Sequence, residues 1–300
     1  MGLTSCLLVV NKNARSGEQL DLKLCVDILQ SGGLSVQIFN VGEGEPDYFA
    51  SLVQQAQMVI VAGGDGSINH VLQSLVGTDK LLAVIPMGTA NDFARNLGIP
   101  TDPSQACELI VAGNIAALDV ASVNGHYFVN VAHIGLGVSV TYELTEEIKK
   151  RWGIFSYLRA FISTLKRLRS FRAKLNVDGR VKRHRLLHLS VGCGRFYGGG
   201  NVVDEQCYAN NGWLNITGLR KRNLFKLLIS LPFIRFGRHR LIKEAIVAKA
   251  QRFEIYTPKA MEIHADGEPV GHTPAVFELH ARILKVIYNP NDHHLILSHN

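Results

Sequence analysis

The chain has 300 residues, of which 47% are apolar and 19% are charged, and its formal net charge is +7. This composition is that of a folded globular protein and excludes an intrinsically disordered chain. The positive charge favours an anionic partner, which could be a nucleotide, a nucleic acid or an acidic membrane surface. The five cysteines are widely spaced and form no C-x-x-C pair, so we expect neither a zinc site nor a redox motif.

Short apolar runs alternate with helical periodicity over residues 3–112. This alternation predicts a Rossmann-like α/β domain, in which helices cover both faces of a parallel sheet. Ligands of such sheets bind at the carboxyl ends of the strands. Three loops leave those ends, at residues 11–17, 63–67 and 87–92. The predicted strands are 6–11, 34–41, 58–62 and 81–86, and the predicted helices are 18–30, 47–55, 68–76 and 103–112.

After residue 113, Asn-Gly and Asp-Gly turn signals separate short apolar runs. These signals predict β-hairpins, so we expect an antiparallel, β-rich sandwich domain with helices inserted at about 139–168 and 223–236. We place the boundary near residue 120, which gives domains of 1–120 and 121–288, and the tail of about 289–300 could return to the first domain. The predicted hairpins pair 115–123 with 127–132, 174–177 with 186–191, and 261–265 with 275–279.

The most informative motif is Gly63-Gly64-Asp65-Gly66-Ser67, which directly follows the apolar run Met58–Ala62. Three glycines let the backbone turn sharply and bring its N–H groups close to a bulky anion. Ser67 is predicted to begin the next helix, whose positive end would face the same point. Asp65 would repel a phosphate unless a cation or a ribose hydroxyl lies between them. The motif therefore indicates a nucleotide that is handled with a metal ion.

Two further loops have a similar composition. Asn11-Lys12-Asn13-Ala14-Arg15-Ser16-Gly17 follows the first strand, and Gly88-Thr89-Ala90-Asn91-Asp92-Phe93 follows the fourth. Taken singly, each loop is an ordinary turn with a helix cap, for which Thr89 or Asn91 is suited. Because all three loops are expected at one edge of the sheet, we interpret them together as a phosphate site.

The segments Gly63–Ser67 and Gly88–Arg95 together closely resemble the diacylglycerol kinase catalytic domain family, in particular its bacterial lipid kinases. The first motif is shared with NAD kinases, whereas the second motif, combined with a late Asp-Gly-Glu, is far more selective. The resemblance covers nearly the whole chain in the family's order. It continues through Phe128-Val129-Asn130, Gly135, Tyr197-Gly198-Gly199-Gly200 and Asp266-Gly267-Glu268-Pro269.

The resemblance implies a kinase that depends on ATP and Mg²⁺ and phosphorylates the hydroxyl group of a diacylglycerol-like lipid. The nucleotide would lie in a cleft between the α/β domain, which binds it, and the β-rich domain, which binds the lipid. Phosphoryl transfer needs a metal to offset the phosphate charge and a group to take the proton of the acceptor. The residues expected at ATP are Asn11, Lys12, Asn13, Ala14, Asn40, Gly63, Gly64, Asp65, Gly66, Ser67, Asn69 and Thr89.

The family's proton acceptor maps onto the turn formed by residues 266–268. We assign Glu268 as the base, with Asp266 as an aligned partner that could exchange roles with it. Asp65 is the candidate for the network around the Mg²⁺ that accompanies the nucleotide.

In relatives, a second and structural Mg²⁺ is bound by a loop that maps onto Tyr208, Asn211 and Trp213. Asn211 stands where relatives have a carboxylate, and an amide oxygen adds no charge, so we expect weaker metal binding. His70 is a second departure, because relatives usually carry Glu at that position. Either departure leaves room for reduced activity.

The stretch Arg151–Lys174 carries seven basic residues and no acidic one, interleaved with apolar residues, and Phe225–Arg240 is similar but shorter. A basic amphipathic helix can lie on anionic lipid, although the solvated face of a core helix is an equally good interpretation. We expect a cytoplasmic protein with peripheral contact at the inner membrane face. No nucleic-acid-binding module is recognised. A homodimer is compatible with the sequence.

Two other functions remain open. An NAD kinase would share the glycine motif, but Asn130 is followed by Val131, whereas NAD kinases carry an Asn-Glu pair for the substrate ribose. A non-catalytic nucleotide- or lipid-binding protein is suggested by the departures at His70 and Asn211. The retained carboxylates of the glycine motif and of the late turn argue against that second alternative.

Overall fold

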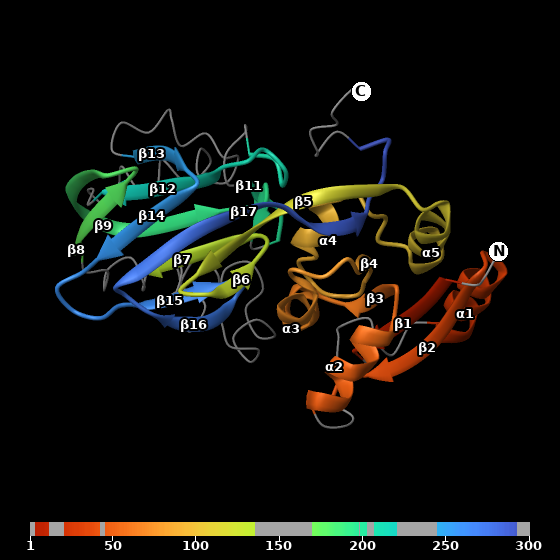
Figure 1. Cartoon of the computed structure of the whole chain (residues 1–300). Helices are drawn as coiled ribbons and strands as arrows, with labels where there is room; N and C mark the ends of the chain where they lie inside the picture. Colours follow the sequence, from red (N-terminus) through yellow and green to blue (C-terminus); the bar gives the residue numbers. More distant parts are fainter. Residues whose placement is uncertain are drawn as a thin grey trace, which may run out of the picture.

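Two parts of the chain lie side by side in this computed structural model, with the N-terminal half on the right and the β-rich half on the left of Figure 1. Strand β17 (Ala275–Ile287) joins them, because it pairs with β14 (Arg252–Tyr256) and also, in parallel, with β4 (Leu81–Pro86). The strands of both parts therefore belong to one sheet, apart from a separate pair formed by Phe196–Tyr197 and Asn201–Val202. The structure describes residues 4–11, 21–42, 46–135, 170–197, 199–202, 207–220 and 245–292, and the helices predicted at 139–168 and 223–236 lie outside these ranges.

The N-terminal part is a parallel sheet with strand order β4-β3-β1-β2, which confirms the predicted α/β fold. Strands β3 and β4 are buried almost throughout, as expected for parallel strands covered on both faces. Helix α1 packs against α5, and α2 packs against α3. None of the helices in the described ranges is long and apolar enough to cross a membrane. The elements are β1 (Thr4–Val10), α1 (Leu22–Ser31), β2 (Leu34–Asn40), α2 (Pro46–Gln55), β3 (Met58–Gly63), α3 (Asp65–Leu75), α4 (Asp92–Asn96) and α5 (Pro103–Ala112).

The C-terminal part is antiparallel, as predicted, and its strands follow the order β16-β15-β7-β9-β8-β14-β17. Phe128, Phe253 and Phe277 fill its core, with the rings of Phe253 and Phe277 stacked 4.6 Å apart. The remaining strands are β5 (Ile115–Val123), β6 (His126–Phe128), β7 (Val131–Gly135), β8 (Phe171–Val177), β9 (Arg180–Gly192), β10 (Phe196–Tyr197), β11 (Asn201–Val202), β12 (Leu214–Arg220), β13 (Ala245–Ala250), β15 (Glu262–Ala265) and β16 (Glu268–His272).

The predicted turns are all present, but two of the predicted strand pairings are wrong. Residues 174–177 pair with 180–183 rather than with 186–191. The pairs Asn124-Gly125, Asp178-Gly179 and Asp266-Gly267 all have positive φ at both residues, as tight two-residue hairpin turns require. The strand 261–265 pairs with β16 rather than with 275–279. Sequence reasoning missed β16 because it contains Pro269 and Gly271, which weaken a strand signal but are tolerated at the edge of a sheet.

The predicted strand 127–132 is likewise divided into two. Its first half, β6, pairs with β5, and its second half, β7, pairs with β9 and β15. The division falls at Val129 and Asn130, whose backbone N–H groups bond to a side chain rather than to a neighbouring strand.

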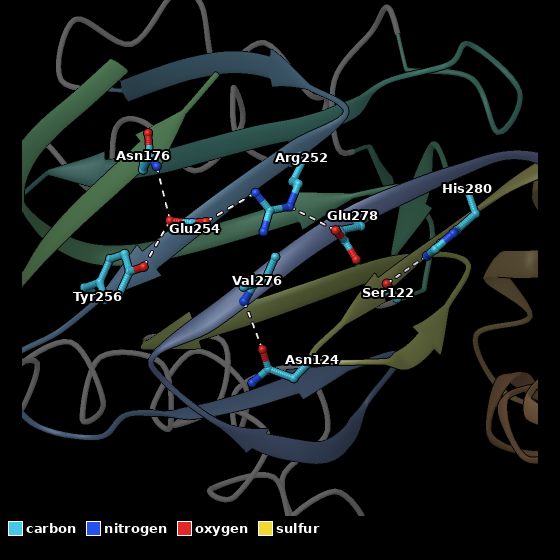
Figure 2. Close-up of polar contacts among 9 residues, drawn as sticks. All are labelled: Ser122, Asn124, Asn176, Arg252, Glu254, Tyr256, Val276, Glu278 and His280. Atoms are coloured by element: carbon cyan, nitrogen blue, oxygen red, sulfur yellow. Dashed lines mark hydrogen bonds and ion pairs between the residues drawn. The ribbon is translucent and has the colours of Figure 1, made fainter. Parts of the chain in front are cut away.

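Polar side chains cover the outward face of β8, β14 and β17 (Figure 2). Glu254 accepts hydrogen bonds from Asn176 (3.1 Å) and Tyr256 (3.0 Å), and Arg252 lies 3.3 Å from Glu254 and 2.9 Å from Glu278. Exposed pairs of this kind contribute little to stability, because water and salt screen them. The stability of this part therefore depends on the aromatic core beneath the sheet.

Candidate active site

The glycine motif begins its helix earlier than the sequence suggested. Helix α3 starts at Asp65, and its N-cap is Gly64, whose backbone is extended and makes no side-chain cap. The prediction that Ser67 begins the helix is therefore wrong. A glycine cap leaves no polar side-chain signal, which explains the error. Ser67 lies within the first turn, where its Oγ accepts a hydrogen bond from Asn11 Nδ2 at 2.8 Å.

The loops at 63–67 and 87–92 meet at one edge of the sheet, and Asn11, the described residue of the third predicted loop, reaches Ser67 there. The N–H of Met87 donates to the carbonyl of Gly63 (2.9 Å), and a Cβ on Gly88 would lie 2.7 Å from the Cα of Gly64. The two loop backbones thus touch, and only glycine fits there. Asn40 is at the end of β2, in register with the last residue of β1. Residues Lys12, Asn13 and Ala14 lie outside the described ranges.

Asp65 joins the loop of residues 63–67 to helix α4. Its carboxylate accepts the N–H groups of Asp92 (3.1 Å) and Phe93 (2.9 Å), so it occupies the amides at the start of that helix. Asn91 is the N-cap residue of α4, as the sequence suggested, but its side chain makes no capping hydrogen bond, and Thr89 is not the cap. Asn91 instead bonds to the N–H and the carbonyl of Gly88 (2.8 and 3.0 Å), and Thr89 is exposed.

Asp92 fastens a further glycine segment to the same helix. Its buried carboxylate accepts the N–H groups of Gly200 (2.7 Å) and Gly199 (2.9 Å). Burial raises the pKa of this carboxyl, and the two amide bonds act in the opposite direction. Sequence reasoning treated Asp92 only as a polar loop residue, because its partners are more than one hundred positions away.

Asp266 is the first residue of the turn between β15 and β16. Its carboxylate accepts three backbone N–H groups, those of Val129 (2.8 Å), Asn130 (3.0 Å) and Val131 (2.9 Å). The pKa of this carboxyl is raised to about 6 overall, because the effect of burial, with a smaller contribution from the charge of Asp65, outweighs the three amide bonds that lower it. Asp266 therefore attaches the turn between β15 and β16 to residues 129–131, where β6 ends and β7 begins.

Glu268 differs from its neighbour in the same turn. It is exposed at the first position of β16, and its carboxylate has no hydrogen-bond or ion-pair partner within the described part of the chain. Its carboxylate is thus open to accept a proton from a bound molecule, whereas the buried carboxylate of Asp266 already accepts three backbone N–H groups and keeps one lone pair, on Oδ2. The geometry favours Glu268 as the base, and that assignment stays a prediction.

Two predicted features of α3 contact neighbouring elements. Asn69 is buried, and its Oδ1 lies 3.5 Å from Gln73 Nε2, which also donates to the carbonyl of Tyr127 (2.8 Å). His70 is exposed and stacks on Phe49 of α2, with ring centroids 5.9 Å apart. His70 thus contacts α2 through its ring.

The loop expected to hold a structural Mg²⁺ uses its oxygens internally. Asn211 Oδ1 accepts the N–H of Trp213 (3.0 Å), and the carbonyl of Tyr208 accepts the N–H of Asn211 (3.3 Å). The nearby carboxylate of Asp119, which sequence reasoning missed, accepts the N–H groups of Gly212 (2.6 Å) and Arg282 (3.0 Å). No cluster of three His, Cys, Asp or Glu side chains suited to a metal occurs among the described residues. The donors present do not fit a tightly bound second Mg²⁺.

Two family models match the chain. Residues 5–123 match the diacylglycerol kinase catalytic domain, and residues 131–288 match the YegS C-terminal NAD kinase beta sandwich-like domain. The diacylglycerol kinase of Bacillus subtilis is 31% identical over 75% of each chain, and that of Staphylococcus carnosus is 28% identical over 93% of this chain and 94% of the relative. The crystal structure of a candidate diacylglycerol kinase from Bacillus anthracis is 27% identical, with a TM-score of 0.79 over 96% of both chains.

Proposed function

Since this chain belongs to the diacylglycerol kinase catalytic domain family, we propose that it transfers the γ-phosphoryl group of ATP to the hydroxyl of a diacylglycerol-like lipid. Its relatives are named diacylglycerol kinases and lipid kinases, so the chain is a phosphotransferase with an alcohol acceptor. The use of ATP and Mg²⁺ and the identity of the lipid are the parts that we add.

The touching glycine loops support the role of ATP. Backbone N–H groups exposed by glycines bind phosphate oxygens well, and Gly64 and Gly88 meet where the strands end. Each carboxylate oxygen of Asp65 accepts one N–H group and keeps a further lone pair. Asp65 could therefore hold the Mg²⁺ that arrives with ATP, and that ion would offset the charge on the β- and γ-phosphates.

The contrast between Asp266 and Glu268 is the observation that carries the proposed reaction. Asp266 is anchored by three amides, and it presents Glu268 as an open carboxylate beside it. Glu268 takes the proton of the lipid hydroxyl while that oxygen forms a bond to the γ-phosphorus. The bond from this phosphorus to the bridging oxygen breaks, and ADP leaves with the electron pair. No step uses a second metal.

The buried state of Asn130 supports a lipid over NAD as the acceptor. Its side chain is 4% exposed and accepts a hydrogen bond from Asn96 at 3.0 Å. An asparagine that is to bind a substrate ribose must present its amide to the cleft. Here the amide is turned toward α4, and Val131 takes the place of the glutamate that NAD kinases carry next to it.

We include contact with the inner membrane face in this proposal, because a diacylglycerol-like acceptor lies in the bilayer. The register places exposed Arg172 opposite Arg185 and Lys174 opposite Arg183, so four cations share one face of the β8–β9 hairpin. Such a cluster attracts anionic lipid. Residues 151–169, which hold most of the predicted basic helix, lie outside the described ranges. Sedimentation with anionic vesicles should show binding that is lost at high salt, and salt-insensitive binding would contradict this role.

A panel of acceptors tests the proposed reaction. The protein is incubated with ATP, Mg²⁺ and diacylglycerol, other lipid alcohols or NAD, and each product is identified by mass spectrometry. We expect a phosphorylated lipid and unchanged NAD. Phosphorylation of NAD alone would overturn the proposal, and binding of ATP without any transfer would favour a non-catalytic relative.

A further inference from the structure

Helix α4 is a short, buried element to which the segments of the site are attached. Its first amides bond to Asp65 of the glycine motif, and its residue Asp92 bonds to the segment at Gly199 and Gly200. Phe93 and Asn96 of this helix are each 1% exposed. Asn96 is the last residue of this helix, and its side chain bonds to Asn130 and to the backbone at residues 195 and 196.

The side chain of Asn96 links helix α4 to residues 195–196 and to Asn130. Its Oδ1 accepts the N–H groups of Arg195 (2.9 Å) and Phe196 (3.3 Å), and its Nδ2 donates to Asn130 Oδ1 (3.0 Å). These partners fix the orientation of the side-chain amides of Asn96 and Asn130. A backbone N–H can only donate, so the atom facing it is the oxygen of Asn96, and the opposite nitrogen must find an acceptor.

Close packing around Gly194 shows that this junction has no spare room. A Cβ on Gly194 would lie 2.6 Å from Asn96 Nδ2 and 2.9 Å from the carbonyl oxygen of Val129. The carbonyl of Asn130 in turn accepts the N–H groups of Cys193 (2.9 Å) and Gly194 (3.1 Å). A displacement of the Asn96 side chain would therefore move the backbone at Asn130.

Asn130 is also one of the three residues whose amides hold Asp266. We propose that Asn96 is a positioning residue, which through Asn130 holds the turn of residues 266–268 in a fixed place relative to the nucleotide loops on α4. It touches neither substrate directly. This inference rests on the proposed function only for its effect on turnover, because the positioning itself is a property of the free protein.

The effect follows from the geometry of phosphoryl transfer. The base and the γ-phosphate are held by different halves of the chain, and Asp65 and Asn96 attach these halves to opposite ends of one short helix. A misplacement of about 1 Å between reacting groups can cost on the order of 100-fold in rate. Loss of Asn96 should thus lower kcat while the loops that bind ATP stay in place.

The test is a double-mutant cycle of Asn96→Ala and Asn130→Ala, with Asn176→Ala as the matched control. Asn176 also uses its side-chain amide in a hydrogen bond, to Glu254 (3.1 Å, Figure 2), but it lies on strand β8 outside this junction. We measure kcat, the KM for ATP, and the hydrogen exchange of the amides at 129–131. We expect each junction variant to lower kcat about 10- to 100-fold with little change in KM, and the double variant to add little more.

Hydrogen exchange keeps the inference testable apart from activity. The amides at 129–131 should exchange on the order of tenfold faster in Asn96→Ala than in the control, because their hydrogen bonds to Asp266 open more often. Equal exchange in the two variants, or additive losses of kcat in the cycle, would overturn the role of Asn96. If the wild-type protein phosphorylates no lipid, the proposed function fails, and the exchange data still decide on positioning. Asn130→Ala serves if Asn96→Ala does not fold.

Discussion

Replacing Asp266 by asparagine should change how the stability of the protein depends on pH. The folded-state pKa of this carboxyl is raised from its ordinary value of 3.8 to about 6, chiefly because the carboxylate is buried. A folded state with the higher pKa holds the proton more tightly than the unfolded chain does. The stabilising effect is therefore complete below about pH 4 and is lost as the pH rises through about 6.

The magnitude follows from the same pKa. A rise from 3.8 to about 6 corresponds to about 3 kcal/mol of unfolding free energy, because each pKa unit is worth about 1.4 kcal/mol. The asparagine side chain of the variant has no titratable group, so this contribution is absent from it. The difference in unfolding free energy, wild type minus Asp266→Asn, should fall by about 3 kcal/mol between pH 3 and pH 7.

The assay is urea unfolding of both proteins at a series of pH values, with the free energies obtained by linear extrapolation. The difference between the proteins is used because every other titrating group is present in both. A difference that stays flat over this range, or that rises with pH, would refute the claim that burial of the Asp266 carboxyl outweighs its three amide bonds.

Three further substitutions test the site. Gly88→Ala should weaken ATP binding at least tenfold and lower stability by about 1–3 kcal/mol, because its Cβ would meet the Gly64 backbone at 2.7 Å. Gly66→Ala is the control, because open space surrounds Gly66 and its stability should stay that of the wild type. Equal thermal unfolding of the two variants would contradict this reasoning. Asp65→Ala should abolish transfer and lower stability by about 1–2 kcal/mol through the lost cap of α4, without unfolding the protein, and wild-type turnover would remove it from the site. Glu268→Gln should lower kcat by two or more orders of magnitude while calorimetry still shows ATP binding. If turnover survives in this variant and Asp266→Asn is inert, Asp266 takes the proton.

The local features of the fold could be predicted from sequence because short-range chemistry specifies them. Each Asn-Gly or Asp-Gly pair adopts positive φ at both positions, and the apolar runs at β3 and β4 are buried as expected. Strand β16 was missed because Pro269 and Gly271 are allowed there only by its place at the sheet edge, which no local signal reveals.

The anchoring of the site could not be predicted in this way. Asp266 lies 136 positions from Asn130, and Asn96 lies 34 positions from it. Their roles depend on which strands become neighbours, and a sequence without its topology gives no sign of that. The glycine motifs were found because their composition marks them, whereas buried asparagine and aspartate partners have no such mark.

Transfer of labelled phosphate is the measurement that tests the central claim most directly. Wild-type protein and Glu268→Gln are incubated with Mg²⁺ and ATP labelled in its γ-phosphate, in the presence of diacylglycerol in mixed vesicles together with NAD. We predict that the label enters the lipid with the wild-type protein and is nearly absent from the lipid with the variant. Label in NAD, or equal lipid labelling by both proteins, would contradict the account.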